Sequence, residues 1–445
     1  MSHRTVVLFV AILAAFSPAE ALWPEPRSIQ SGSHALQLAH SFDISISGHS
    51  APQDLSDAIA RTKSYLTNDK LERLVVGRGA SDVSLFKNSK TLSKLSLSLT
   101  EGSTVLSITK EAQKPIEERD EAYSLVVPSD GSAATLTANS TLGLFRGLTT
   151  FGQLWYEYES TTYALNTPLS IQDSPAYPYR GLMLDTARNF FPVADIKRTL
   201  DAMSWVKINQ FHWHVVDSQS FALQIPGFTD LAAKGAYSSS MVYSPSDVQG
   251  IVSYAGEPPA GQLRFADATV TSYVADLFTA ITKLFPSTLF STGGDELNTN
   301  CYAADAPTQA SLNATGRTLE QALDVFTQAT HKALELQGKT PVVWEEMVLD
   351  HNVTLSPKHD CLDCGGGGWV GDFPTGNSWC DPFKTWQHSY SFDPTANLTV
   401  DESKLVLGGQ HLLWTEQSGP QNLDPIIGPV QPLLQSFSGL GRVGT

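Results

Sequence analysis

The sequence predicts an α/β protein, namely a TIM-type (β/α)8 barrel preceded by a small α+β domain. After Tyr179, apolar runs that end in polar or acidic residues alternate with helical stretches. This pattern is typical of buried parallel strands with a site at their carboxyl ends. Before Pro168, short segments of alternating polarity are mixed with amphipathic stretches, which is typical of an α+β layer. The Pro-rich joint after Gln172 divides the chain into residues 22–172 and 173–445.

The N-terminus has the order of a secretory signal. Arg4 precedes an apolar run over residues 6–16, and the small-residue triplet Ala19-Glu20-Ala21 follows it. We therefore expect residues 1–21 to be a signal peptide that is cleaved after Ala21. The run is too short to span a membrane, which takes about 20 residues. The mature protein is expected to be secreted, or to lie in a vacuolar or lysosomal lumen, without a membrane anchor.

The bulk composition limits the partners. With 41% hydrophobic and 17% charged residues, the 445-residue chain has the composition of a globular protein. Its net charge of −16 repels phosphate backbones and anionic lipid headgroups, so we expect neither nucleic acid nor membrane as a partner. A neutral substrate such as a sugar suits this charge.

Glycosylation acceptors and cysteines agree with a secretory route. The Asn-x-Ser/Thr acceptors are Asn139, Asn313, Asn352 and Asn397. The cysteines are Cys301, Cys361, Cys364 and Cys380, and an oxidising compartment favours disulfides between them. The spacing of Cys361 and Cys364 also fits a redox or zinc pair, but no second such pair accompanies it.

The elements of the first domain follow from hydrophobic periodicity. We expect strands where polarity alternates and helices where apolar residues recur every three to four positions, with the second helix packed on the sheet. The expected strands cover residues 95–99 and 104–109, and the expected helices cover residues 54–66 and 142–158. No residue of this domain suggests catalysis.

The second domain contains only five recognisable strands, where a complete barrel needs eight. The expected strands cover residues 180–185, 208–217, 289–296, 341–345 and 405–416, and the helices cover residues 192–206, 246–254 and 319–336. There is no room for a strand between residues 254 and 257 or between residues 353 and 361. The tail from Gly428 has no clear helical face where a closing helix is due. The barrel is therefore predicted to be incomplete.

Gly293-Gly294-Asp295-Glu296 is the sharpest chemical feature. Two glycines allow a tight turn, and two carboxyls sit side by side at a strand end. Because adjacent like charges resist double ionisation, one pKa of the pair should rise, as a general acid requires. The alternative is a solvated acidic pair at a turn.

Two further groups of residues, a His-Trp-His segment and two tryptophans, each allow a functional and a structural interpretation. His212, His214 and Asp217 are compatible with metal ligation, but two histidines two apart on one strand face more often pack or form hydrogen bonds, so we expect no metal and no cofactor. Trp344 and Trp414 each end an apolar run and precede a glutamate within two residues. A flat indole suits a pyranose face, and a buried core position is the alternative for each.

Five ordered segments make the chain resemble family 20 glycoside hydrolases, with the closest similarity to fungal β-N-acetylhexosaminidases. The resemblance covers nearly all of the mature chain. The segments are Tyr179-Arg-Gly-Leu-Met-Leu-Asp-Thr-Ala-Arg-Asn-Phe-Phe, Phe211-His-Trp-His-Val-Val-Asp-Ser, Gly293-Gly-Asp-Glu, Val343-Trp-Glu-Glu and Leu413-Trp-Thr-Glu. The resemblance implies a retaining mechanism in which the 2-acetamido group of the substrate, rather than a protein side chain, attacks the anomeric carbon.

The resemblance also implies roles for individual residues. Glu296 would protonate the leaving oxygen and then activate water, and Asp295 would orient the acetamide N–H. The remaining implied roles are sugar hydroxyl binding by Arg180, a pocket wall from Trp344 and Trp414, acceptance of hydroxyl hydrogen bonds by Glu416, and support of the polar network by Asp217.

The chain departs from the family pattern at three places. The family's third strand is missing, as are its sixth and seventh strands with a Trp and a Tyr that serves the acetamide, and the tail after Ile427 replaces the eighth helix. In the family Cys301 pairs within the missing third-strand region, whereas Cys364 and Cys380 remain a plausible bridge. These excisions indicate a spliced or gene-model product.

The sequence therefore predicts a β-N-acetylhexosaminidase that removes terminal GlcNAc or GalNAc from oligosaccharides or glycoconjugates. The alternative is an inactive or glycan-binding truncated relative. A family 18 chitinase is disfavoured because the chain lacks an Asp-x-x-Asp-x-Asp-x-Glu segment. Many family members dimerise, so a homodimer stays open.

Overall fold

A computed structural model gives the fold of the chain. It describes residues 22–48, 50–69, 71–217, 219–252, 265–294, 297, 299–344, 346–349, 351, 353, 360–361, 395, 398–415 and 418–424. Several expectations fall outside these residues: the signal peptide over residues 1–21, the tail from Gly428, and Asp295, Glu296, Glu416, Cys364, Cys380, Asn352 and Asn397. The chain divides into an α+β unit, Met1–Glu111 with Asp120–Ser174, and a barrel unit, Ala112–Arg119 with Pro175–Thr445.

The α+β unit is built on a six-stranded sheet with the order β1-β2-β4-β3-β6-β5. Its strands are β1 (Ser28–Ile46), β2 (Lys90–Leu99), β3 (Tyr123–Val127), β4 (Ala134–Ala138), β5 (Tyr156–Tyr158) and β6 (Thr161–Asp173). The long strand β1 runs antiparallel to β6 from Ser28 to Gln37 and parallel to β2 from Leu36 to Ile46. Because β1 pairs on both sides, the sheet closes on itself.

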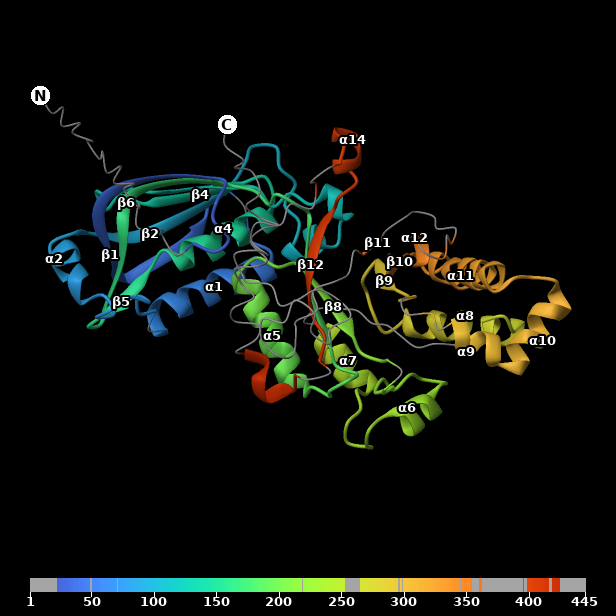
Figure 1. Cartoon of the computed structure of the whole chain (residues 1–445). Coiled ribbons are helices and arrows are strands. Elements are labelled where there is room, and N and C mark those ends of the chain that lie inside the picture. Colours follow the sequence, from blue (N-terminus) through green and yellow to red (C-terminus); the bar gives the residue numbers. More distant parts are fainter. Residues whose placement is uncertain are drawn as a thin grey trace, which may run out of the picture. The chain divides into compact units, whose positions relative to one another are not determined.

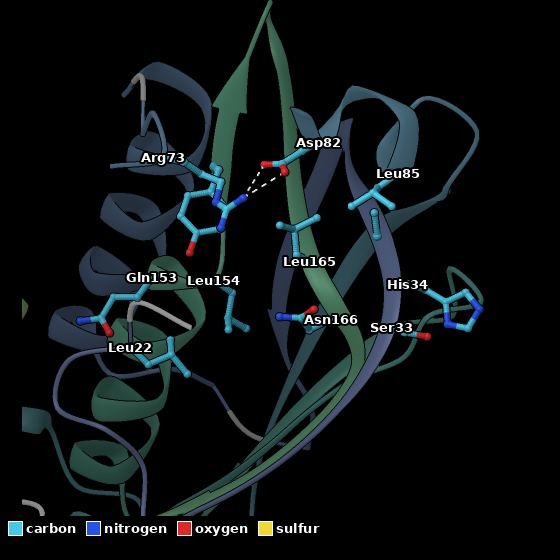
Figure 2. Close-up of a pocket in the computed structure, with 12 residues that line it drawn as sticks. Leu22, Ser33, His34, Arg73, Asp82, Leu85, Gln153, Leu154, Leu165 and Asn166 are labelled. Atoms are coloured by element: carbon cyan, nitrogen blue, oxygen red, sulfur yellow. Dashed lines mark hydrogen bonds and ion pairs between the residues drawn. The ribbon is translucent and has the colours of Figure 1, made fainter. Parts of the chain in front are cut away.

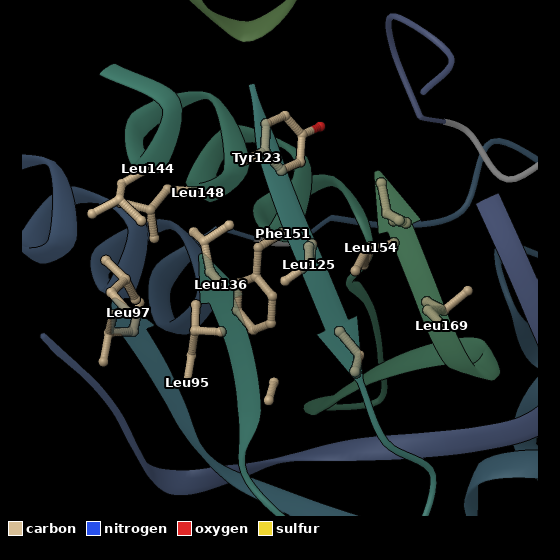
Figure 3. Packing of buried hydrophobic residues seen from close by; sticks show 14 of the residues in the cluster. Leu95, Leu97, Tyr123, Leu125, Leu136, Leu144, Leu148, Phe151, Leu154 and Leu169 are labelled. Atoms are coloured by element: carbon tan, nitrogen blue, oxygen red, sulfur yellow. The ribbon is translucent and has the colours of Figure 1, made fainter. Parts of the chain in front are cut away.

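Helix α4 covers one face of this sheet, as the sequence predicted (Figure 3). The helices of the unit are α1 (Gln53–Asn68), α2 (Val83–Phe86), α3 (Ile108–Ala112) and α4 (Thr141–Gln153). Ser140 caps α4 by accepting a hydrogen bond from the Gly143 N–H. Gly147 allows close approach to the sheet, because a Cβ there would lie 2.3 Å from the Leu136 Cδ1 atom. Phe151, fully buried, fills the layer between helix and sheet.

Two expectations for this unit were wrong in detail. Residues 104–109, expected as a strand, enter the short helix α3 instead, because their alternating pattern is too short to separate a strand from one helical turn. The helix expected over residues 142–158 ends at Gln153, and Tyr156–Tyr158 forms β5.

The α+β unit also contains a cavity of about 210 Å³, lined by polar and apolar side chains (Figure 2). Its main charges neutralise each other, because the Arg73 Nη1 atom donates to both carboxylate oxygens of Asp82 at 3.0 and 2.8 Å. The Tyr163 hydroxyl donates to the same carboxylate at 2.8 Å. The pair therefore ties the loop around Arg73 to β6, which is a structural role.

In the described part of the barrel unit, six parallel strands form two separate three-stranded sheets, β12-β7-β8 and β11-β10-β9 (Figure 1). The strands are β7 (Tyr179–Asp185), β8 (Gln210–His214), β9 (Leu289–Ser291), β10 (Thr340–Trp344), β11 (Asp360–Cys361) and β12 (Gly408–Leu413). Five of them were predicted. The sixth, β11, is a two-residue strand at the end of a stretch predicted to hold none. Among the described residues, no strand joins β8 to β9 or β11 to β12.

Helices alternate with these strands as in a (β/α) repeat. They are α5 (Val193–Trp205), α6 (Thr229–Gly235), α7 (Pro245–Val252), α8 (Ala268–Ile281), α9 (Thr299–Ala304), α10 (Ala306–Thr315), α11 (Leu319–Glu335), α12 (Glu346–Leu349) and α14 (Val400–Ser403). Thr318 and Gln321 form a capping box that starts α11. Trp213 and Phe290, both fully buried, belong to the core that packs α5, α7 and α8 against the strands. Within the described residues, no helix combines the length and the apolar character needed to cross a bilayer.

Candidate active site

Polar and aromatic side chains gather at the carboxyl ends of the barrel-unit strands. Asp185 ends β7, His214 ends β8 and Trp344 ends β10. Trp414 directly follows β12, and Thr292 directly follows β9. This edge of a parallel barrel sheet is where (β/α) proteins place their chemistry.

Trp344 and Trp414 bring the two sheets together. Their ring centroids lie 5.9 Å apart at an interplanar angle of 46°. The two predicted indoles are therefore neighbours. Trp344 is 3% exposed, whereas Trp414 is partly exposed to solvent. His214 meets the Trp414 ring edge-on at 4.8 Å, and His212 stacks on Trp344 at 6.0 Å. The result is an aromatic wall made from three strands.

Arg188 lies over this wall, a position that the sequence patterns did not indicate. Its guanidinium carbon is 4.9 Å from the centre of the Trp414 ring, which is a cation–π contact. The Nη2 atom lies 3.1 Å from the Asp217 Oδ2 atom, and Nη1 lies 3.2 Å from the Asp185 Oδ2 atom. The sequence feature that could have indicated Arg188 is its position, because it follows the carboxyl end of a strand.

Asp185, which the sequence patterns also did not indicate as a site residue, holds together the elements around Arg188. It is fully buried, and its Oδ1 atom accepts hydrogen bonds from the backbone N–H groups of Ala187 at 2.9 Å and Arg188 at 3.2 Å. Its Oδ2 atom accepts from the Thr415 N–H at 3.1 Å and the Thr415 hydroxyl at 3.0 Å. One carboxylate thus ties β7 to the end of β12 and holds Arg188 beside Trp414.

The two histidines of β8 have separate partners. The His214 Nε2 atom lies 2.6 Å from the Asp217 Oδ2 atom, whereas the His212 Nδ1 atom lies 3.3 Å from the Gln410 Oε1 atom. Burial, with a smaller effect of nearby His214, lowers the pKa of His212 to about 4, so the ring is neutral at pH 7. Within the described residues, no three His, Cys, Asp or Glu side chains form a metal-binding group. Asp217 faces Arg188 and His214 together.

The structure corrects the expected position of Arg180. This residue lies near the start of β7, at the opposite end from Asp185, and is 3% exposed. Its Nε atom donates to the Lys207 carbonyl at 3.1 Å, and its Nη1 atom donates to the Tyr177 carbonyl at 2.8 Å. Arg180 therefore holds the amino-terminal edge of the sheet and does not reach the aromatic wall. The resemblance covers two arginines in one segment, and the structure brings Arg188 rather than Arg180 to the aromatic wall.

The acidic pair follows a tightly fixed segment. Asp295 and Glu296 lie outside the described residues, but Thr292, Gly293 and Gly294 before them are described. The Trp344 N–H donates to the Gly293 carbonyl at 3.2 Å, which ties this segment to the end of β10. Gly294 has φ of 107°, a conformation that favours glycine. The segment thus leaves β9 next to Trp344.

Two family models match the chain. The model described as glycosyl hydrolase family 20, catalytic domain, matches residues 177–260 and 255–364. The model described as beta-acetyl hexosaminidase like matches residues 22–154. The two parts of the first match meet at residues 255–260, next to the place where the sequence indicated an excised strand.

Relatives with this family's names match much of the chain. The β-hexosaminidase subunit β of Mus musculus is 31% identical over 481 positions, covering 94% of this chain and 86% of the relative. Because 481 positions exceed the 445 residues of this chain, the mouse protein has residues without a counterpart here. A β-hexosaminidase of Arthroderma benhamiae and a chitooligosaccharidolytic β-N-acetylglucosaminidase of Bombyx mori are each 31% identical over 70% of this chain. The chain spans 65% and 66% of their lengths.

Solved structures share the fold. A chitobiase of Flavobacterium johnsoniae superposes with a TM-score of 0.72 at 21% identity, covering 95% of this chain and 70% of that one. A family 20 β-N-acetylhexosaminidase of Streptomyces coelicolor superposes with a TM-score of 0.70 at 19% identity, covering 96% and 93%. These likenesses confirm the predicted fold class, a TIM-type barrel with a small domain before it. The chain belongs to glycosyl hydrolase family 20.

Proposed function

We propose that this protein is a retaining β-N-acetylhexosaminidase that acts on terminal, non-reducing GlcNAc or GalNAc residues of oligosaccharides or glycoconjugates. The observation that carries the proposal is the cluster of Trp344, Trp414, Arg188 and Asp217 beside the segment that leads into Asp295 and Glu296. An apolar wall with a charged, hydrogen-bonding corner suits a pyranose, which has apolar faces and polar edges.

In the first step the substrate supplies the nucleophile. The carbonyl oxygen of the 2-acetamido group attacks the anomeric carbon as the bond from that carbon to the leaving oxygen breaks. The carboxyl of Glu296 gives its proton to the leaving oxygen. Asp295 accepts a hydrogen bond from the acetamide N–H and balances the positive charge of the oxazolinium ion that forms.

In the second step water opens the oxazolinium ring. The Glu296 carboxylate takes a proton from the water while the water oxygen bonds to the anomeric carbon. At the same time, the bond between the anomeric carbon and the acetamide oxygen breaks. The acetamide is restored and the acid is protonated again. Two displacements at one carbon leave its configuration unchanged.

The walls of the site hold the sugar. Trp344 and Trp414 pack against its apolar surface, and Glu416 accepts hydrogen bonds from its hydroxyl groups. We assign hydroxyl binding by an arginine to Arg188 in place of Arg180, because Arg188 lies over Trp414 and Arg180 donates to backbone carbonyls at the other strand end. Asp217 and Asp185 fix the Arg188 guanidinium from two sides.

The test is turnover of 4-nitrophenyl N-acetyl-β-D-glucosaminide by the full chain. We expect hydrolysis by the wild type and a fall in kcat of about 10²- to 10⁴-fold in Glu296→Gln. Glu335→Gln is the matched control, since that glutamate lies on α11 and pairs with Lys332. Full turnover in Glu296→Gln would contradict the proposal.

The open sheets favour one alternative, an inactive relative that binds glycans without cleaving them. Among the described residues, β8 and β9 each have only one neighbouring strand. A folded chain that binds chitooligosaccharides but gives no turnover supports this alternative. Turnover that depends on Glu296 excludes it.

We also propose a secretory route for the chain. Two of the four glycosylation acceptors are described, and both Asn139 and Asn313 are exposed. Enzymatic removal of N-linked glycans should lower the mass of the protein from a eukaryotic host. An unchanged mass would contradict glycosylation at these sites.

A further inference from the structure

The hydroxyl group of Thr292 lies between two elements at the end of β9. Its oxygen is 3.0 Å from the Nε2 atom of His331 on α11 and 3.3 Å from the Val342 carbonyl oxygen on β10. The Thr292 N–H also donates to the Val342 carbonyl at 2.8 Å. Thr292 is thus anchored to the neighbouring strand through its backbone and to the covering helix through its side chain.

His331 is built to hold this contact. It is 7% exposed, on the buried face of α11. Burial lowers its pKa to about 4, so the ring is neutral at pH 7. The tautomer with hydrogen on Nε2 satisfies both contacts at once, because Nε2–H donates to Thr292 while the Thr292 hydroxyl donates to the Val342 carbonyl.

The segment after Thr292 has little freedom. Gly293 has φ of 68° and Gly294 has φ of 107°. A Cβ on Gly294 would lie 2.3 Å from the Met347 Cγ atom, so Met347 closes one side of the turn. The Trp344 N–H holds the Gly293 carbonyl. These contacts and the anchor at Thr292 together set the direction in which the chain leaves toward Asp295.

We propose that His331 is a positioning residue for the Asp295–Glu296 pair. Its hydrogen bond to Thr292 fixes where the chain leaves β9, and through two glycines this sets where the two carboxyls start. His331 itself touches no substrate. The inference rests on the proposed hexosaminidase activity, in which displacement of a general acid by about 1 Å costs up to about 10²-fold in rate.

The test compares four variants of the full chain. His331→Leu and Thr292→Val each remove the hydrogen bond, whereas His331→Gln keeps a donor near the Nε2 position. Thr330→Val is the matched control, because Thr330 is 2% exposed on the same helix and its hydroxyl bonds to the Phe326 carbonyl of that helix at 2.9 Å.

We expect the two disrupting variants to lower kcat about 10- to 100-fold with KM changed less than about threefold, since the acid acts in the transition state. His331→Gln should recover most of the rate, and the double variant should be no worse than either single one. Equal losses in His331→Leu and Thr330→Val, or none in either, would overturn the proposal.

Amide hydrogen exchange separates this inference from the proposed function. A peptide spanning residues 292–297 should exchange faster in His331→Leu than in the wild type, and unchanged in Thr330→Val. If the wild type gives no turnover, the proposed function fails. The exchange result alone then decides whether His331 anchors the segment after Thr292. Unchanged exchange in His331→Leu would refute it.

Discussion

In the α+β unit the sheet returns on itself, because β1 pairs with β6 along its first half and with β2 along its second. In the barrel unit the six described strands form two sheets of three, and among the described residues side-chain packing rather than strand pairing joins the two sheets. At the cavity of the α+β unit, the charged side chains of Arg73 and Asp82 are paired with each other. The candidate site lies in the barrel unit, at the carboxyl ends of strands whose two sheets are not paired with each other among the described residues.

The largest expected effect is loss of barrel-unit stability in acid. Burial lowers the pKa of His212, His331 and His411 to about 4, against 6.5 for an ordinary histidine. The unfolded chain therefore takes up protons more readily, and stability present above pH 6.5 is lost as pH falls toward 4. Each histidine contributes up to about 3 kcal/mol.

Unfolding temperatures between pH 7 and pH 4 check this, with hydrogen exchange to assign the loss to a unit. His411→Leu removes one titrating group and should flatten the pH profile. A profile that is equally steep in this variant would contradict the role given to burial of His411.

Truncation of one buried phenylalanine in each unit compares their packing directly. Phe151 and Phe290 are both fully buried. We expect Phe151→Ala to cost about 4 to 5 kcal/mol and Phe290→Ala about 3 kcal/mol, because the end strand β9 can relax into the cavity more easily. Denaturant unfolding gives both values. A larger cost for Phe290 would show that the barrel unit is the more tightly closed of the two.

The α+β unit contains an ion pair in which both side chains are buried. The Arg146 Nε atom lies 2.5 Å from the Glu121 Oε2 atom, and both side chains are buried. Arg146→Met removes the opposite charge from a buried carboxylate and should cost about 3 kcal/mol. The exposed pair of Lys63 and Asp43 is the control, and Lys63→Met should cost about 0.5 kcal/mol. Similar costs for both substitutions would mean that burial does not govern these pairs.

Apart from the control at Lys63, the smallest expected stability change comes from the hydrogen bonds that tie β7 to β12. Asp185→Asn keeps the shape of the side chain but weakens its hydrogen bonds to Thr415 and Arg188, at a cost of about 2 kcal/mol. Peptides of the barrel unit should exchange faster, and those of β1 to β6 should not. In an active chain KM should rise as Arg188 loosens. An unchanged KM would argue against the hydroxyl-binding role of Arg188.

Much of the fold was predictable because helices and strands follow from the polarity pattern of neighbouring residues. The strands β7, β8, β9, β10 and β12 and the helices α5, α7 and α11 lie where apolar runs and helical periodicity placed them. The prediction of a strand over residues 104–109 was wrong because six alternating residues fit a strand or a helical turn equally well. Helix α8 was missed, although Asp267 caps it by accepting a hydrogen bond from Thr269.

The site was predictable in kind and less so in detail. The sequence indicated Trp344, Trp414 and Asp217, and the structure brings them together, although their roles remain proposals. It also indicated Arg180, because a motif does not say which of two arginines faces the site. Strand direction decides that, since residues before and after a strand lie at opposite ends of the sheet.

The sequence alone determined the class of fold, the order of the strands and the motifs of a sugar hydrolase, because each depends on short runs of neighbouring residues. Only the tertiary structure decided that Arg188 rather than Arg180 meets Trp414, that Asp185 joins two distant strands, and that His331 reaches Thr292. Those contacts join residues 39 to 230 positions apart, and sequence patterns are local. Packing brings such pairs together, so they become visible only once the chain is folded.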